Sequence, residues 1–435
     1  MKKYPKYKLS GVEWFHEIPI NWDIQKIKFQ GKVISGSTPE TSREEFWEGD
    51  IVWATPVDFG SDSQKYIYTS SRKITPEGLN NIGGKLIPKG AVIISSRAPI
   101  GLVAIAGVNL ATNQGCKSIV PKKINSEYLF FCLKEFCKVL ENLGNETVFA
   151  ELSLGSLKNF LITIPQLTEQ LSIVRFLDYK TNQIDCFIAN RQKQMELLKE
   201  QKAAIINKAV TKGIKPDVKM KLSGIEWLPE VPESWNVWKM KFLTQIETGN
   251  KNTEDAEENG AYPFYVRSDN VERISTYSFE GEAILTAGDG VGVAKVYHYA
   301  NCKMAIHQRV YKISHFKKVY GEYLYYYIRD NFEKEVIKLS AKTTVDSLRM
   351  PMLANFPVAY PTMDEQQLIL DYIKTESQTI ETLISKYQKQ IDLMQEYRTS
   401  LISQAVTGKI DVSEWRPKAK KYSTEQLPLS IAAEK

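Results

Sequence analysis

The stretch YKLSGVEWFHEIPINW, at residues 7–22, returns as MKLSGIEWLPEVPESW at residues 220–235, at an offset of 213. Trp14 therefore aligns with Trp227, and Trp22 aligns with Trp235. The same offset continues through further pairs along the chain, namely Lys26/Lys239, Lys28/Lys241, Phe29/Phe242 and Gly36/Gly249. A match of this length and spacing predicts that the chain contains two copies of one fold.

A second repeat closes each copy at an offset of 196. It pairs Leu157/Leu353, Asn159/Asn355, Phe160/Phe356, Pro165/Pro361, Glu169/Glu365, Gln170/Gln366, residues 192–194 with 388–390, and residues 209–211 with 405–407. The difference, 213 − 196 = 17, makes the second interior 17 residues shorter. Fainter matches join the interiors: Glu127-Tyr128-Leu129 resembles Glu322-Tyr323-Leu324, and Asn113-Gln114 falls opposite His307-Gln308. This pattern favours one scaffold that carries two different readers; the alternative is a duplicated structural domain with no reading role.

Composition sets broad limits on the class of protein. The length of 435 residues suits about two to three domains, and 43% hydrophobic with 25% charged residues is typical of soluble globular domains. The sequence contains no run of about 18 apolar residues, so we expect no membrane span. The basic N-terminus lacks the apolar segment of a signal peptide. A net charge of +6 is compatible with a polyanionic partner without requiring one.

Cysteine usage argues against a metal site. The five cysteines form no Cys-x-x-Cys pair. We therefore expect no zinc site, and an odd number of cysteines suits the reducing cytoplasm.

Short β-type runs separated by turn residues fill both interiors. Residues 91–94 and 102–105 are strand candidates in the first copy, and residues 282–285 and 293–296 are their counterparts in the second. Each copy also contains a short helix, near residues 126–140 and 321–336. The expected fold class is α+β, with two internally repeated mixed α/β domains separated by two long antiparallel coiled-coil helices.

A long helix follows each interior. Thr168 and Asp364 are the expected N-caps, and Gly213 and Gly408 are the expected C-terminal stops. About 44 residues at ~1.5 Å each would form a rod of roughly 65 Å.

One seven-residue register fits both helices, and packing of both stripes into a globular core is the alternative to a coiled coil. The apolar positions expected at the helix–helix interface are Leu177, Ile184, Ile188, Met195, Leu198, Ile205, Ile373, Ile380, Ile384, Ile391, Met394 and Leu401. Polar exceptions coincide between the two helices, as in Thr181 with Ser377 and Lys202 with Arg398.

These observations divide the chain into five segments. They are an N-terminal segment with the first mixed α/β domain at 1–163, a first long helix at 164–217, a second mixed α/β domain at 218–359, a second long helix at 360–412, and a Lys-rich tail at 413–435.

The duplicated segments, together with the paired proline, acidic and Glu-Gln helix starts, resemble the specificity subunits of Type I restriction-modification systems. GSTPETSREEFWEGDIVWATPVDFG at residues 36–60 and SSRAPIG at residues 95–101 are also similar to pieces of that family's target-recognition domains. The resemblance covers the chain up to about Arg416. The duplicated architecture is its most specific feature, whereas a single fragment would be weak evidence.

The resemblance implies a function that composition could not indicate. Each recognition domain would read one half of a bipartite double-stranded DNA site, and the paired helices would set the distance between the halves. The chain would dock two methyltransferase subunits, which two ATP-dependent restriction subunits can join. Adenine methylation and cleavage, with S-adenosylmethionine, ATP and Mg²⁺, would belong to those partners, so this chain would hold no cofactor. Because the interiors differ, the expected site is asymmetric.

Three superficial motifs do not support catalysis by this chain. The run Gly288–Gly292 leads into a strand-like segment rather than a helix, which favours a tight hairpin over a dinucleotide loop. Residues 78–85 have Leu79 where a phosphate loop needs its first glycine and Leu86 where it needs Ser or Thr. No Asn-Pro-Pro or Asp-Pro-Pro motif of an adenine methyltransferase is present. We therefore name no catalytic or metal-binding residue.

The candidate DNA-reading residues lie in the interiors, because Arg, Lys, Asn, Gln and Ser supply the contacts to base edges and phosphates. They are Lys65, Arg97, Asn113, Gln114 and Lys117 in the first copy, and Lys251, Arg267, Ser268, His307, Gln308 and Arg309 in the second. For each of them the alternative is a solvated surface residue. Two other classes of protein compete with a DNA reader: a self-contained methyltransferase, which the missing motifs disfavour, and a coiled-coil scaffold without DNA, which the diverged basic and aromatic interiors disfavour.

Overall fold

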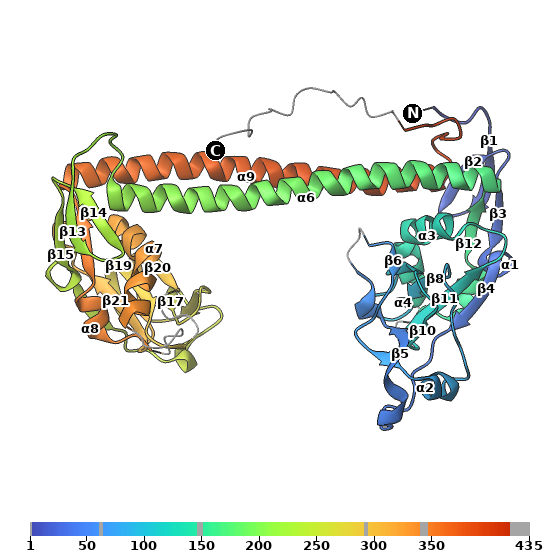
Figure 1. Cartoon of the computed structure of the whole chain (residues 1–435), viewed down its shortest axis with the longest axis horizontal. Helices are drawn as coiled ribbons and strands as arrows, with labels where there is room; N and C mark the ends of the chain where they lie inside the picture. Colours follow the sequence, from blue (N-terminus) through green and yellow to red (C-terminus); the bar gives the residue numbers. More distant parts are fainter. Residues whose placement is uncertain (1, 61–63, 146–150, 291–294, 340–346, 418–435) are drawn as a thin grey trace, which may run out of the picture. The chain divides into compact units, whose positions relative to one another are not determined.

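The computed structural model describes residues 2–60, 64–145, 151–290, 295–339 and 347–417. Contacts divide the chain into two compact units (Figure 1). Unit 1 comprises residues 1–191 and 389–435, and unit 2 comprises residues 192–388. Both boundaries fall inside the long helices α6 (Leu167–Lys212) and α9 (Met363–Val406), so each unit holds the start of one long helix and the end of the other.

Unit 1 is a mixed α/β unit built on short strands. Its strands are β1 (Tyr7–Val12), β2 (Phe15–Pro19), β3 (Asp23–Lys26), β4 (Gly31–Ser35), β5 (Trp47–Ala54), β6 (Tyr66–Ile67), β7 (Lys73–Ile74), β8 (Val92–Ser95), β9 (Val103–Ala106), β10 (Ala111–Thr112), β11 (Cys116–Pro121) and β12 (Leu161–Ile164). The largest sheet has the order β4-β11-β8-β9-β6, and smaller sheets pair β10-β5-β7, β1-β2 and β12-β3. The helices are α1 (Ile27–Gln30), α2 (Pro76–Asn81), α3 (Ser126–Glu135), α4 (Cys137–Asn145) and α5 (Leu154–Asn159).

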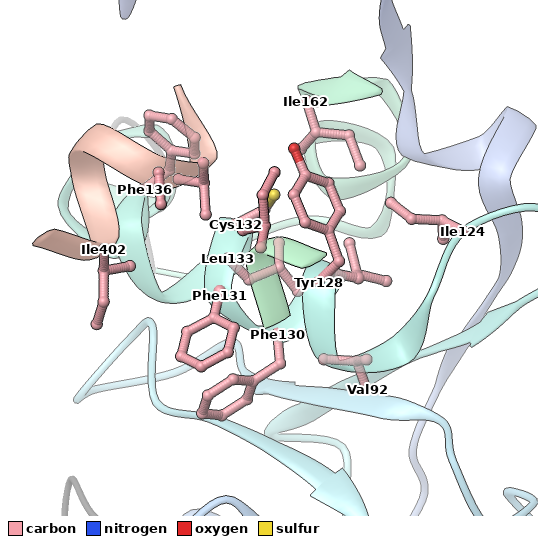
Figure 2. Packing of buried hydrophobic residues seen from close by; sticks show 14 of the residues in the cluster. Val92, Ile124, Tyr128, Phe130, Phe131, Cys132, Leu133, Phe136, Ile162 and Ile402 are labelled. Atoms are coloured by element: carbon pink, nitrogen blue, oxygen red, sulfur yellow. The ribbon is translucent and has the colours of Figure 1, made fainter. Parts of the chain in front are cut away.

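The main core of unit 1 surrounds α3, whose residues from Tyr128 to Leu133 are all buried. Figure 2 shows Phe136 and Ile402 beside these side chains, with Ile402 supplied by the end of α9. Leu401, Ala405 and Val406 belong to the same core. Unit 1 is therefore completed by a segment more than two hundred residues away in the sequence.

Unit 2 repeats this plan. Its strands are β13 (Met220–Ile225), β14 (Leu228–Pro232), β15 (Asn236–Lys239), β16 (Gln245–Thr248), β17 (Tyr262–Tyr265), β18 (Glu272–Ile274), β19 (Phe279–Ala287), β20 (Tyr297–Ile306), β21 (Val310–Ser314) and β22 (Pro357–Tyr360). They form the sheet β16-β21-β19-β20-β17-β18 and the pairs β13-β14 and β15-β22. Helices α7 (Gly321–Leu339) and α8 (Met350–Ala354) follow, and the core includes Ile206 and Val210 from the end of α6. The expected duplicated fold with two long helices is confirmed.

The tryptophans of the repeated segment make equivalent packing contacts in both units. Trp14 stacks on Phe160 with ring centroids 5.0 Å apart, and Trp227 stacks on Phe356 at 5.9 Å. Trp22 and Trp235 are both fully buried. The two offsets found in the sequence, 213 and 196, are thus joined in space by these aromatic pairs, because each pair takes one residue from each repeat.

The repeated Glu-Gln sequence is explained by a buried glutamine at the start of each long helix. In unit 1 the Gln170 amide accepts from the Asn125 N–H at 2.9 Å and donates to the Pro165 carbonyl at 2.9 Å. In unit 2 the Gln366 amide accepts from the Tyr320 N–H at 2.9 Å and donates to the carbonyls of Lys318, at 2.9 Å, and Pro361, at 3.1 Å. Each glutamine therefore ties its long helix to the loop before α3 or α7.

Replacing Gln366 by alanine should lower the free energy of unfolding by about 2–4 kcal/mol, because a buried backbone donor and two carbonyls lose their partner. Urea unfolding followed by tryptophan fluorescence would measure the loss. The matched control is Gln367→Ala, because Gln367 is the next residue, is exposed and donates to Asp371 at 3.0 Å. Equal stability of both variants would contradict this role for Gln366.

The ends of the long helices pair antiparallel within each unit. In unit 1 the Arg398 guanidinium lies 3.4 Å from the Asp185 carboxylate, and in unit 2 the Lys202 ammonium lies 2.5 Å from the Glu381 carboxylate. The residue numbers of each pair sum to 583, which is expected for antiparallel helices, because residue numbers rise along one helix as they fall along the other. Of the predicted interface positions, Leu177, Ile184, Ile373, Ile380, Ile391 and Leu401 are buried, and the other six are half-buried.

The N-caps of both long helices lie two residues before the predicted ones. α6 begins at Leu167 and α9 at Met363, so Thr168 and Asp364 lie inside the first turn rather than at the N-caps. The Thr362 hydroxyl accepts from the Glu365 N–H at 3.4 Å and takes the capping role at the second helix. Gly213 and Gly408 follow the helix ends with φ of 77° and 72°, which confirms them as the stops.

β19 pairs antiparallel with the next strand, β20, so the glycine-rich run begins the connection of a hairpin, at Gly288. That connection extends to Val296 and is longer than a tight turn, and Val291 and Gly292 of the run lie outside the described residues. Of the strand predicted at residues 293–296, Val293 and Ala294 lie outside the described residues, and Val296 directly precedes β20.

Candidate nucleic-acid interface

Each unit places its diverged interior residues on an equivalent frame of strands. In unit 1 a short parallel pair sets Ala111 beside Trp53, and the Asn113 N–H donates to the Ala54 carbonyl at 3.1 Å. In unit 2 the pair sets Ala305 beside Phe264, and the His307 N–H donates to the Tyr265 carbonyl at 3.0 Å. Asn113-Gln114 and His307-Gln308, which matched faintly in the sequence, therefore occupy the same place in the two units.

A repeated glycine lets the chain approach this place closely. The Ser37 N–H donates to the Thr112 carbonyl at 2.8 Å, and the Asn250 N–H donates to the Ile306 carbonyl at 3.1 Å. A Cβ atom on Gly36 would lie 1.9 Å from the Asn113 carbonyl oxygen, and one on Gly249 would lie 2.1 Å from the Ile306 oxygen. Only glycine fits at these two positions, which explains why the sequence repeats it at an offset of 213.

A turn beside this frame carries opposite charges in the two units. The Ser96 N–H donates to the Gly115 carbonyl at 2.7 Å and the Ser96 carbonyl accepts from the Leu152 N–H at 2.8 Å. Gly288 makes the same two bonds, to the Arg309 carbonyl at 2.8 Å and from the Leu348 N–H at 2.7 Å. Ser96 and Gly288 are thus equivalent, and the residues that follow them, Arg97 and Asp289, are equivalent too.

In unit 2 the turn supplies a carboxylate to two arginines. One oxygen of Asp289 lies 2.9 Å from Nη1 of Arg267, and the other lies 2.8 Å from Nη1 of Arg309. Partial burial raises the pKa of the Asp289 carboxyl, but the two guanidinium hydrogen bonds outweigh it and hold that pKa below its usual value. Arg267 and Asp289 line a concave region of about 360 Å³, together with Thr253, Val266, Ser268, Glu272 and Gly290.

In unit 1 the turn supplies a guanidinium instead. Arg97 Nε lies 3.0 Å from Glu151, whose other oxygen lies 2.9 Å from the Lys117 ammonium. Burial raises the pKa of the Glu151 carboxyl, but Lys117 and Arg97 outweigh it and the pKa is lowered. The Lys117 side chain is only 5% exposed in this ion pair, so it stabilises the cluster and is no longer a candidate for DNA contact. Arg97 is half-exposed and remains a candidate.

Lys65 also leaves the candidate set. Its ammonium forms ion pairs with Glu127 and Asp178 and lies 4.8 Å from the centre of the Phe131 ring. Burial raises the pKa of the Asp178 carboxyl, and the opposing effect of the ion pair with Lys65 is too small to cancel this rise. Lys65 directly precedes β6, so its ion pairs join the start of that strand to α3 and α6 inside unit 1.

The remaining candidates fall into exposed and internal positions. Gln114 is exposed and bonds to the Thr38 hydroxyl, and Gln308 and Ser268 are exposed as well, whereas Lys251 and Asn113 are half-buried. His307 is buried, and its Nδ1 accepts from the Arg309 N–H at 3.0 Å. Burial, followed by the charges of Arg267 and Arg309, lowers the pKa of His307. The histidine thus supports the loop that presents Arg309.

Two carboxylates that organise these clusters were missed by sequence reasoning. Asp289 lies in the glycine-rich run, and Glu151 shares no sequence pattern with Arg97 or Lys117. The sequence contains no signal that would select these two carboxylates as partners of the candidate arginines, because the paired residues are 20–54 residues apart in the chain. Among the described residues there is no group of three or more His, Cys, Asp or Glu side chains that could hold a metal ion. No described helix is long and apolar enough to cross a membrane.

Comparison with known proteins agrees with this duplicated arrangement. A protein-family model described as the Type I restriction modification DNA specificity domain matches residues 19–197 and 232–392, once in each copy. The MjaIX Type I restriction enzyme specificity subunit of Methanocaldococcus jannaschii is 30% identical over 423 residues, which cover 92% of this chain and 95% of that protein. The EcoDI specificity subunit of Escherichia coli is 26% identical over 187 residues, 43% of this chain and 41% of that protein.

Solved structures share the fold at low sequence identity. A chain from a study titled as the structural basis of complex assembly and conformational transition of the type I R-M system superposes with a TM-score of 0.68. It is 14% identical, and the match covers 90% of this chain and 99% of that one. The HsdS subunit from Thermoanaerobacter tengcongensis gives a TM-score of 0.52 at 15% identity, over 90% of this chain and 98% of that one.

Proposed function

This chain belongs to the family of Type I restriction-modification DNA specificity subunits, and from that membership we propose that each unit reads one half of an asymmetric bipartite DNA site. The equivalent frames of the two units support two readers of common descent. The long helices α6 and α9 are proposed to set the spacing of the half-sites, because a helix transmits length at ~1.5 Å per residue.

The observation that carries the proposal is the reversed charge at one equivalent turn. Arg97 stands in unit 1 where Asp289 stands in unit 2, on frames that are otherwise held by the same backbone hydrogen bonds. Arg97 can itself donate to a base edge, whereas Asp289 holds two arginines that can donate, so the two turns present their donors differently and suit different bases. Divergence confined to the reading positions is expected of a scaffold that reads two unrelated sequences.

Duplicated exposed apolar residues support two copies of one partner. Phe29 and Phe242 are each 58% exposed, and Leu9 and Leu222 are 75% and 83% exposed, at positions related by the offset of 213. Matching exposed apolar residues on both units would serve two methyltransferase subunits. We propose that these subunits, joined by two ATP-dependent restriction subunits in the cytoplasm, hold S-adenosylmethionine, ATP and Mg²⁺, and that this chain is not catalytic.

The test is a module swap in the assembled methyltransferase complex. Replacing residues 20–160 by the corresponding segment of a related chain should change one half of the methylated sequence and leave the other half intact, as methylome sequencing would record. Base edges are read locally, so neither reader should influence the other. The isolated chain serves as a control and should transfer no methyl group. A swap that altered both halves would refute the two-reader proposal.

A further inference from the structure

The arginines of unit 2 hold a defined orientation because they share one carboxylate. Asp289 engages Nη1 of Arg267 with one oxygen and Nη1 of Arg309 with the other. Within the described part of the chain, both arginines make their hydrogen bonds through Nη1, and neither uses Nε or Nη2. Each guanidinium therefore keeps two neighbouring N–H donors on one edge, which is the arrangement that a bidentate acceptor requires.

The charge balance of this site does not suit a phosphate. Asp289 forms ion pairs with both Arg267 and Arg309, and Glu272 lines the same concave region as Asp289 and Arg267. A phosphate would meet two negative groups beside its two cations, whereas a base pair presents donors and acceptors without net charge. The mixture of guanidinium donors and carboxylate acceptors matches the major-groove edge of a G·C pair, in which guanine offers O6 and N7 and cytosine offers its amino group.

We propose that Arg267 and Arg309 are the guanine-reading residues of the half-site bound by unit 2, and that Asp289 is the positioning residue that orients both guanidiniums. This inference rests on the proposed function, because it assigns bases to a surface already taken to read DNA. His307 also helps to position Arg309, because its Nδ1 accepts a hydrogen bond from the Arg309 backbone N–H at 3.0 Å.

The test is methylome sequencing of the chain assembled with its methyltransferase. Arg267→Ala and Arg309→Ala should each lower the preference for guanine at one position of one half-site by about 5- to 150-fold, the range of a bidentate arginine–guanine contact. Asp289→Asn should weaken the preference for guanine at both positions while the other half-site stays unchanged. The control is Arg329→Ala, which removes an arginine from a 2.8 Å ion pair with Asp330 on α7, outside the residues that line the concave region.

Charge and geometry are separated by a second pair of variants. Arg267→Lys and Arg309→Lys keep the positive charge but lose the planar fork, so the preference for guanine should still fall while the salt dependence of binding stays the same. If the alanine variants lose affinity uniformly for all sequences with a shallower salt dependence, the arginines contact phosphates and the inference is overturned. If the lysine variants keep the full preference for guanine, the planar guanidinium is not required and the bidentate contact is overturned.

The outcome also distinguishes this inference from the function on which it rests. If the wild-type complex methylates a bipartite site and the variants leave its guanines unchanged, the base assignment alone fails. If the wild-type complex shows no sequence preference in either half-site, the proposed function fails and the base assignment falls with it.

Discussion

Alanine at position 36 should lower the free energy of unfolding of the chain by about 3 kcal/mol, because its Cβ would collide with backbone rather than with a mobile side chain. The nearest atom would be the Asn113 carbonyl oxygen at 1.9 Å, and the Thr112 hydroxyl and carbonyl oxygens would lie at 2.4 Å and 2.5 Å. Relief requires a shift of the loop that holds Asn113 and Gln114. Thermal unfolding of the purified chain would measure the loss.

Gly155→Ala is the matched control for this substitution, because Gly155 lies inside the helix α5 of the same unit and its nearest neighbour is the Ser153 hydroxyl oxygen at 3.6 Å. Alanine there should stabilise the helix by roughly 0.5–1 kcal/mol. The equivalent Gly249→Ala should reproduce the loss in unit 2. If the Gly36→Ala chain were as stable as the control, the segment at Gly36 and the segment at Thr112 and Asn113 could move apart without cost.

Aspartate at position 380 should destabilise unit 2 by roughly 4 kcal/mol or more. Ile380 is 5% exposed on α9, one residue before the Glu381 that pairs with Lys202 of α6. Loss of a buried isoleucine alone costs about 2–5 kcal/mol, and an unpaired buried carboxylate adds to that cost. Urea unfolding of the variant and recovery of its complex with the methyltransferase would both record the effect.

Leu197→Asp introduces the same charge on the other long helix as a control. Leu197 lies in the same unit and is 53% exposed, so its replacement should change the free energy of unfolding by less than about 0.5 kcal/mol. If Ile380→Asp and Leu197→Asp behaved alike, the apolar register would not describe how the helices of unit 2 pack.

The frame of the fold could be predicted from sequence because it was written twice. Trp14, Trp22 and their copies are buried or stacked in both units, and the glycines at 213 and 408 end the long helices with left-handed φ. The seven-residue register was visible because helical packing repeats with a fixed period. The N-caps were missed by two residues, since acidic and hydroxyl side chains near a helix start can lie in the first turn as well as at the cap.

The reading site was predictable only in part, because the type of a residue does not determine its partner. Lys65 and Lys117 carry the charge that DNA requires, yet carboxylates distant in sequence hold them inside unit 1. Arg267 and Arg309 were named as separate candidates, and the sequence did not indicate that Asp289 forms ion pairs with both of them. Long-range ion pairs leave no local pattern in a sequence.

The exchange of helix ends also constrains the order in which the chain can fold during synthesis. The core of unit 1 contains Leu401, Ile402, Val406, Ile410 and Val412, which leave the ribosome after all of unit 2. Unit 2 contains Ile206 and Val210 from α6, and its own segment is continuous from residue 192 to residue 388. The unit whose synthesis begins first is thus the one whose hydrophobic core closes last, and until then its surface for α9 stays exposed to chaperones or to other nascent chains.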